Sequence, residues 1–254
     1  MMKRVTKTVL TRQLAIASIF TSIFAGSWLG FASSTGAVTF IPPGEGAPQR
    51  GDTASSRSGG VCQHGEVGET QRGVVPLLPQ GNYGTTLADR PEILVYVPAT
   101  QAKQALFSLK DQNKITHYET VVPLSGKAGI VTVRLPKTAQ PLAVGETYTW
   151  YLALQCEGMV RPVSPVQGQI KRIVSNRVAV SPESQSAQSG ETSTLLNTAT
   201  IYGAEGIWYD TIATLARLKA TEPADATIDR HWQELLGSVG LDQFSDISVS
   251  QLEQ

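Results

Sequence analysis

Cys62 and Cys156 are the only cysteines of this 254-residue chain, and their chemistry depends on the compartment to which the protein is sent. In an oxidising compartment two cysteines usually pair, whereas in a reducing one they more often bind a metal or take part in catalysis. The N-terminus indicates export, so we predict a Cys62–Cys156 disulfide across 94 positions. Closing so long a loop would stabilise the fold by about 4 to 5 kcal/mol on the chain-entropy model.

A metal site built from Cys62, His64 and a further ligand is the alternative. Cys-x-His lacks the ligand spacing of zinc sites, and His117 and His231 do not complete it. The chain has no Gly-x-Ser-x-Gly elbow and no His-Glu-x-x-His pattern. The Gly-Lys pair of VPLSGKAG at 122–129 lacks the leading glycine and the Ser or Thr of a phosphate loop. We therefore predict no catalytic, cofactor-binding or metal-binding residue and no cofactor.

The first 37 residues have the layout of a secretory signal. Four basic side chains precede the uncharged stretch LAIASIFTSIFAGSWLGFA, and small residues at 30 and 32, or at 35 and 37, offer cleavage sites. We predict a mature chain that begins near residue 33 or 38; an uncleaved membrane anchor is the alternative. The protein would then be exported to the periplasm or the cell surface, and would contact a membrane only through this segment before cleavage.

Charge excludes one class of partner. Removal of the four basic residues of the signal leaves 17 basic against 21 acidic side chains, and no basic cluster stands elsewhere. Nucleic-acid binding depends on such clusters, so we expect no nucleic acid as partner. Residues 191–254 have ten acidic and three basic side chains, whereas residues 33–190 have a net charge of +3; this asymmetry suggests either docking of the C-terminal segment on the sandwich or an electrostatically complementary partner.

Residues 38–61 are rich in Gly, Ser and Pro, which is typical of a flexible tether. The secondary-structure elements that could position functional side chains begin after this stretch. From 62 to 174 apolar and polar residues alternate with period two, the pattern of strands. Short strands with turn signals between them predict an all-β sandwich. The expected strands are 91–98, 105–109, 114–122, 129–136 and 166–173, with Thr132 and Arg134 pointing outward from the fourth.

The stretch GETYTWYLALQC, 145–156, is a further strand. Tyr148, Trp150 and alternate residues up to Cys156 share one face, so we expect the cysteine to point inward. Leu142, Gly145 and Tyr148 have the spacing of the tyrosine corner of immunoglobulin-like and fibronectin type III sandwiches, in which the Tyr hydroxyl bonds to upstream backbone. The cysteine follows the tyrosine by eight residues instead of the two found in antibody domains.

After a polar linker, 175–192, the apolar period becomes helical. Residues 193–241 predict a small three-helix segment whose first two helices have tetratricopeptide-like spacing, and 242–254 are expected to fray. We take this segment as an α tail that folds apart from the β domain. On this view Trp208, Tyr209 and Trp232 are candidate partner-binding residues, and deletion of 191–254 would leave the β domain folded; closure of a small core against the sandwich is the alternative.

Together these elements resemble the cyanobacterial exported family known as domain of unknown function 928. The resemblance covers about 60–240 and is most specific in LAVGETYTWYLALQC (142–156) and GIWYD (206–210). It implies export in a cyanobacterium and an immunoglobulin-like domain followed by helices, and it brings no assigned catalytic residues.

We therefore predict a mainly β protein, an immunoglobulin/fibronectin-III-like antiparallel sandwich followed by a three-helix, tetratricopeptide-like tail. The leading functional hypothesis is a non-enzymatic binding or scaffold protein of the cell envelope whose partner is another envelope protein. A hydrolase-type enzyme with a site assembled from loop carboxylates is one alternative. A structural accessory module for surface display or secretion is the other.

Overall fold

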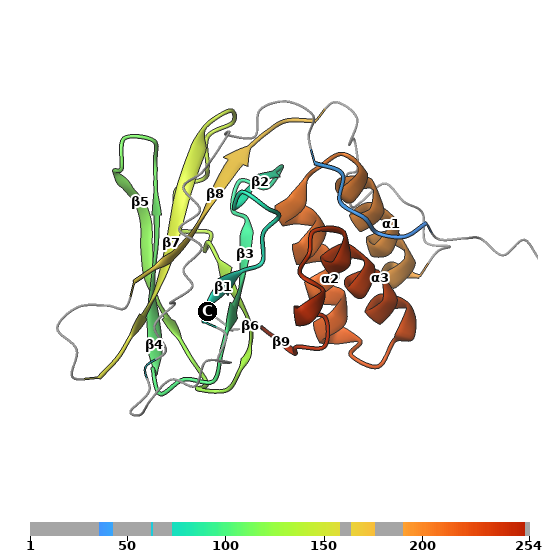
Figure 1. Ribbon diagram of the computed structural model, residues 1–254. Helices are drawn as coiled ribbons and strands as arrows, with labels where there is room; N and C mark the ends of the chain where they lie inside the picture. The colour runs from blue at the N-terminus through green and yellow to red at the C-terminus, as the bar shows by residue number, and fades with distance from the viewer. Residues whose placement is uncertain (1–35, 43–61, 63–72, 158–163, 176–189, 252–254) are drawn as a thin grey trace, which may run out of the picture. The chain divides into compact units, whose positions relative to one another are not determined.

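Two facing β-sheets and a layer of helices make up the described part of the chain (Figure 1). The computed structural model describes residues 36–42, 62, 73–157, 164–175 and 190–251. The first sheet has the order β1-β3-β6-β9, with bounds β1 Val75–Pro76, β3 Glu92–Val97, β6 Gly129–Arg134 and β9 Val249–Gln251. The second has the order β2-β8-β7-β4-β5, with bounds β2 Tyr83–Thr86, β4 Gln104–Lys110, β5 Thr116–Pro123, β7 Thr147–Gln155 and β8 Val166–Arg172.

The prediction of a mainly β fold with three C-terminal helices is confirmed, and all six predicted strands are present within two residues of their expected ends. The sheets are mixed where the prediction was antiparallel, because β8 pairs in parallel with β2, and β6 with β9. Neither β2 nor β9 was predicted from the sequence. The immunoglobulin-like and tetratricopeptide-like descriptions stay predictions.

The strand β7 has the alternation that its sequence indicates. Tyr148, Trp150, Leu152 and Leu154 are buried, whereas on the opposite face Tyr151 is half-buried and the small Ala153 is buried. The Tyr148 hydroxyl accepts a hydrogen bond from the Ala143 amide at 3.1 Å, so the predicted bond of the tyrosine corner is formed.

The predicted disulfide is also present. Cys62 is bonded to Cys156, with 5.4 Å between their Cα atoms. Its formation removes Cys62 as a metal ligand, since a metal binds the thiolate and not the disulfide. The Cys62 backbone is held on the sandwich as well, because its carbonyl accepts a hydrogen bond from the Gln101 amide at 3.2 Å.

The helices lie against the first sheet and the edge strand β2 (Figure 1). α1 spans Glu191–Ala204, α2 Trp208–Thr221 and α3 Ala226–Ser238, and the short 3-10 helix η1 spans Asp242–Phe244. The carboxylate of Asp225 caps α3 by accepting the amides of Thr227 and Ile228. Among the described residues, helices are too short and too polar to cross a bilayer.

The helical segment packs against the sheets, so the expectation of an independent tail was wrong and the alternative, closure against the sandwich, is the correct one. The central strand β3 is buried on both faces: Val95 lies among the sandwich core, whereas the ring of Tyr96 contacts Phe244 of η1 at 4.9 Å. Thr132, opposite Leu94 in the neighbouring strand, is also buried, although we expected it to point to solvent. The helices cover the face of the sheet that the sequence pattern assigned to water.

The expected boundaries of the domains change for the same reason. Residues 242–251 do not fray, because η1 and β9 return the chain to the first sheet, where β9 pairs with β6. The helices begin at Glu191, two residues before the expected start. The predicted signal segment lies outside the described residues up to position 35, as do most of the expected tether and linker.

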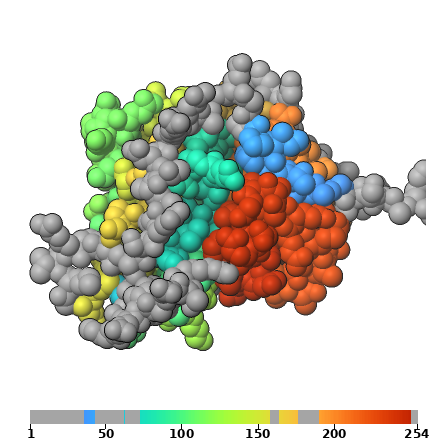
Figure 2. Space-filling view, viewed as in Figure 1, coloured from blue at the N-terminus to red at the C-terminus, as the bar shows by residue number. Residues whose placement is uncertain are grey.

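The described part of the expected tether is ordered, so a flexible tether is the wrong description there. Residues 36–42, which we call the strap, lie across the helical layer (Figure 2). Its alternate residues Val38 and Phe40 are buried, whereas Thr39 and Ile41 are exposed. A period of two lets an extended segment bury one side against the helices.

Candidate functional site

The GIWYD stretch, 206–210, joins the helices to the sandwich. The carbonyl of Gly206 accepts a hydrogen bond from the Thr85 hydroxyl of β2 at 2.8 Å. The indole Nε1 of Trp208 donates to the Leu77 carbonyl at 2.9 Å. Gly206 has φ +71, a left-handed conformation that favours glycine, and it lies two residues before the start of α2. This stretch therefore docks the helices on the sandwich.

Tyr209 forms the deepest contact of this junction. Its hydroxyl accepts a hydrogen bond from Trp150 Nε1 at 2.8 Å and donates to the Gln169 carbonyl at 3.0 Å. These partners lie on β7 and β8, so one hydroxyl ties α2 to two strands of the second sheet. Burial raises the pKa of Tyr209 well above the ordinary tyrosine range, so the hydroxyl keeps its proton and can donate.

The three candidate partner-binding residues are all in the interior. Trp208, Tyr209 and Trp232 are 0%, 2% and 0% exposed. A partner cannot reach these rings, so their assignment to a binding surface was wrong. An aromatic residue on a helix has the same sequence signature whether its face meets a partner or the protein's own sheet.

Asp210, which the sequence analysis did not single out, ends the same motif and lines a small polar cavity. Its carboxylate accepts the Leu87 amide at 3.1 Å, and burial raises the pKa of Asp210 above its ordinary value, opposed by bonds from Thr86 and the nearby backbone. The cavity has a volume of about 240 Å³ and is also lined by Arg90, Glu92, Tyr202 and Arg217.

A buried carboxyl of raised pKa could act as a general acid, and Glu92 in the same cavity is a second carboxylate. Both groups already have structural partners. Asp210 holds the turn after β2, and Glu92 forms an ion pair with Arg134 at 3.1 Å. Of the scattered acids in the sequence, the structure brings Glu92 to the cavity with Asp210.

The strap is bound to two helices by its backbone. The Val38 amide faces His231 Nδ1 at 3.4 Å, and the Phe40 amide donates to the Ser238 hydroxyl at 3.2 Å, both on α3. The Ile41 amide donates to the Gly203 carbonyl of α1 at 3.0 Å. The Phe40 ring meets the edge of Trp208, with ring centroids 5.0 Å apart.

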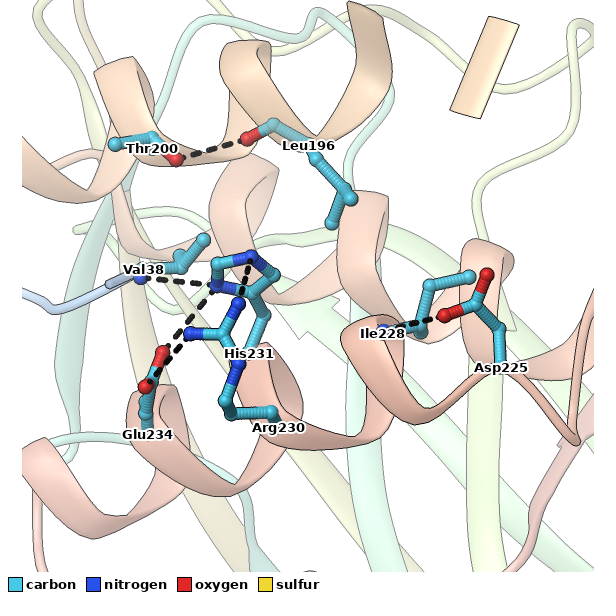
Figure 3. Close-up of polar contacts among 8 residues, drawn as sticks. All are labelled: Val38, Leu196, Thr200, Asp225, Ile228, Arg230, His231 and Glu234. Atoms are coloured by element: carbon cyan, nitrogen blue, oxygen red, sulfur yellow. Dashed lines mark hydrogen bonds and ion pairs between the residues drawn. The ribbon is translucent and has the colours of Figure 1, made fainter. Parts of the chain in front are cut away.

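His231 lies in a cluster of polar groups beneath the strap (Figure 3). The Val38 amide and Glu234 Oε2 approach the same ring nitrogen, Nδ1, at 3.4 and 3.3 Å. Arg230 approaches the other ring nitrogen at 3.4 Å and forms an ion pair with Glu234 Oε1 at 3.1 Å. Burial, then the charge of Arg230, lowers the pKa of His231, so the ring is neutral at pH 7.

An apolar cavity of about 340 Å³ opens beside the strap. Phe40 and Pro42 of the strap form one wall, Tyr83 and Gly84 another, and the end of α3 at 238–240 a third. A second cavity of about 520 Å³ shares Pro79, Gln80 and Gly81 and the residues Val239 and Gly240 with the first. The two cavities therefore adjoin on either side of the 79–81 turn, and we refer to them together as the apolar trough.

Within the described ranges, no three His, Cys, Asp or Glu side chains lie close enough together to bind a metal ion. His117 lies on β5, with its Nε2 bonded to the Gln140 carbonyl at 2.9 Å. His64 falls outside the described residues.

Residues 50–249 match the model of a protein family described as Domain of Unknown Function (DUF928). No curated protein matches the chain. The matched region includes the two sheets, the three helices and the GIWYD stretch, and it begins after the strap. The match covers most of the chain, so the similarity to this family extends over the whole fold and is not limited to one motif.

Proposed function

We propose that this chain, which belongs to the family of the Domain of Unknown Function (DUF928), is an exported, non-enzymatic binding or scaffold protein of the cell envelope. The basic and apolar N-terminal segment supports export to the periplasm or cell surface, and the Cys62–Cys156 disulfide is compatible with an oxidising compartment. The sequence resemblance supports a cyanobacterial source. The partner would be another envelope protein.

The observation that carries the proposal is the apolar trough beside the strap. Its walls combine apolar side chains with the polar side chains of Gln80, Asn82, Thr85, Gln167 and Ser238, and the exposed Gly81 lies on its rim. Such a cavity suits the apolar side chain of an extended peptide segment, whose backbone could bond to exposed amides and carbonyls. Its volume is that of a small ligand site, so one or two side chains of a partner would fill it.

The polar cavity gives less support to the hydrolase alternative. A carboxyl pair for glycoside hydrolysis needs one free carboxylate and one free acid. Here Asp210 accepts backbone amides and Glu92 pairs with Arg134, so each already stabilises the fold. A binding role needs no further group.

Site-specific cross-linking tests the proposal. A photoreactive residue at Gln80, on the rim of the trough, should trap one envelope protein, whereas the same residue at Gln112, on the remote turn after β4, should not. Val239→Trp should abolish the Gln80 product by filling the trough. Val144→Trp, at a half-exposed valine outside the trough, is the matched control and should leave the product unchanged.

Two outcomes would contradict the proposal. Equal yields of the cross-linked protein from Gln80 and Gln112 would show that the partner contacts the surface without binding at the trough. Hydrolysis of an envelope polysaccharide that is lost in both Asp210→Asn and Glu92→Gln would support the enzyme instead.

A further inference from the structure

The backbone nitrogen of Val38 is buried beside a pair of hydrogen-bond acceptors, His231 Nδ1 and Glu234 Oε2, that have too few protons between them. Val38 is 0% exposed, whereas Gly36 and Ala37 before it are exposed. An amide has one proton, and it points to Nδ1 of His231. Glu234 Oε2 is buried 3.3 Å from the same Nδ1, and a proton on Nδ1 is the only one in the described part of the chain that it can accept.

The protons of His231 cannot resolve this shortage. A neutral imidazole has one N–H and one lone-pair nitrogen. If Nδ1 accepts from Val38, it has no proton for Glu234. If Nδ1 donates to Glu234, as the approach of the Arg230 guanidinium to Nε2 favours, the Val38 amide loses its acceptor. An acceptor or donor left unsatisfied in the interior destabilises the fold, and a charged one most of all.

An α-ammonium group in place of the amide would satisfy both groups. It has three protons, so it can donate one to Nδ1 of His231 and direct another toward Oε2 of Glu234, which lies 3.3 Å from the same Nδ1; Nε2 then carries the ring proton, and Arg230 keeps its ion pair with Glu234 Oε1. Its charge would pair with the Glu234 carboxylate, whose other oxygen is bound by Arg230. A buried charge is tolerated where it is paired and hydrogen-bonded.

The sequence places a cleavage site at this bond. Thr35 and Ala37 are the small residues that the export peptidase requires before its scissile bond, and the alternative site after Ala32 would leave five more residues before Val38. The two sites are equivalent in sequence, but the later one puts the new amine in the cluster of Figure 3.

We infer that the export peptidase cleaves the chain between Ala37 and Val38, and that the new α-ammonium of Val38 binds His231 and Glu234 and locks the strap on α3. The inference rests on the export step of the proposed function. In the reaction, water adds across the Ala37–Val38 amide. Ala37 leaves as a carboxylate on the released segment, and the Val38 nitrogen takes up a proton to become the ammonium.

The first test is the N-terminal sequence of the protein recovered from the exported fraction. We expect Val38 as the first residue. A chain that begins at Ser33 would overturn the inference and leave export intact. A chain that keeps Met1 or Met2 on a membrane-bound form would overturn both, so the two failures are distinguishable.

The second test uses purified protein and does not depend on export or on any partner. Chains that begin at Val38 with a free amine, at Val38 with an acetylated amine and at Gly36 are unfolded by heat at pH 7. The free-amine Val38 chain should unfold about 3 °C or more above the other two. Glu234→Gln should remove this difference, whereas Glu119→Gln, on the remote strand β5, should preserve it.

A third measurement reports the amine directly. In the folded Val38 chain the α-amine should react with an acylating reagent at least about tenfold more slowly than in urea, and Glu234→Gln should restore much of the rate. Equal melting temperatures for the three chains, or a difference that survives Glu234→Gln, would overturn the binding of the ammonium.

Discussion

At the scale of single residues, the hydroxyl of Tyr209 connects the helices to the sandwich. Tyr209→Phe keeps the ring but leaves the buried Trp150 Nε1 without an acceptor and the Gln169 carbonyl without this donor. We expect a loss of about 1 to 3 kcal/mol in the free energy of unfolding. Urea denaturation followed by tryptophan fluorescence measures it.

Tyr151→Phe is the control for that variant. Tyr151 is half-buried on the outer face of β7, and its ring lies under the ammonium of Lys110, a contact that phenylalanine keeps. The free energy of unfolding of Tyr151→Phe should lie within about 0.5 kcal/mol of that of the natural protein. Equal effects of the two variants would contradict the role of the Tyr209 hydroxyl.

Gly203 allows the strap to approach α1. A Cβ at this position would lie 2.5 Å from the backbone oxygen of Thr39, so Gly203→Ala must displace the strap. We expect a loss of about 1 to 3 kcal/mol and faster hydrogen exchange at the Ile41 amide, which bonds to the Gly203 carbonyl.

Gly237, in the last turn of α3, is the matched control, because no atom lies within 4 Å of a Cβ built there. Gly237→Ala should stabilise the protein by about 0.4 to 1 kcal/mol through the unfolded state. Unchanged exchange at Ile41 in Gly203→Ala would show that the strap does not depend on this contact.

Asp210 makes stability depend on pH. Burial raises its pKa in the folded state above the unfolded value of 3.8, so the folded protein holds this proton more tightly than the unfolded chain. Its contribution is therefore most favourable below pH 3.8 and declines as pH rises through the folded pKa.

Asp210→Asn removes this titration. The free energy of unfolding of the natural protein minus that of the variant should fall from about pH 4 upward and then level off. Urea denaturation of both proteins across that range measures the difference, in which other groups cancel. A difference that rises with pH would mean that the carboxylate is stabilised as the anion.

At the scale of elements, the helices and the first sheet form one folding unit. Without residues 191–254, the face of β3 that bears Tyr96 loses η1, and β6 loses its neighbour β9. We therefore expect the truncated chain to be unfolded or molten, with a narrow amide region in its NMR spectrum. A dispersed spectrum with cooperative unfolding would restore the independent-tail interpretation.

The sequence pattern was sufficient for elements whose signal is local. β3 to β8 were predicted because alternation and turn residues mark each strand, and α3 because its apolar residues recur on one side of a helix. β2 and β9 were missed: YGTT and VSQ have no apolar alternation, and each is a strand because it pairs with a distant one.

The polar clusters around Asp210 and His231 were missed for a related reason. Asp210, His231 and Glu234 gain their surroundings only when helices meet the sheet or the strap. Thr132 shows the same limit, because a polar residue in an alternating strand indicates solvent unless another layer covers that face. The disulfide could be predicted because composition and compartment alone restrict two cysteines to one pairing.

At the scale of the molecule, contacts of high sequence separation hold the chain's distant parts together. The strap binds α3 across 193 positions, Trp208 binds the Leu77 carbonyl across 131, and the disulfide spans 94. Such contacts form late in folding, since each closes a long loop. A covalent closure therefore constrains the unfolded chain more than any single one of the hydrogen bonds.

Reduction of the disulfide should therefore cause a large loss of stability. The double variant Cys62→Ser, Cys156→Ser should lose about 4 to 5 kcal/mol of stability, the entropy that a 94-residue loop returns to the unfolded chain. Thermal unfolding with and without dithiothreitol checks this expectation: reductant should lower the midpoint of the natural protein to that of the variant and leave the variant unchanged. Two cysteines that titrate as free thiols in the exported protein, or a natural protein insensitive to reductant after unfolding and refolding in it, would contradict the role of the bond. If the expectation holds, the fold reaches full stability only in an oxidising compartment, which ties the stability of the protein to its export.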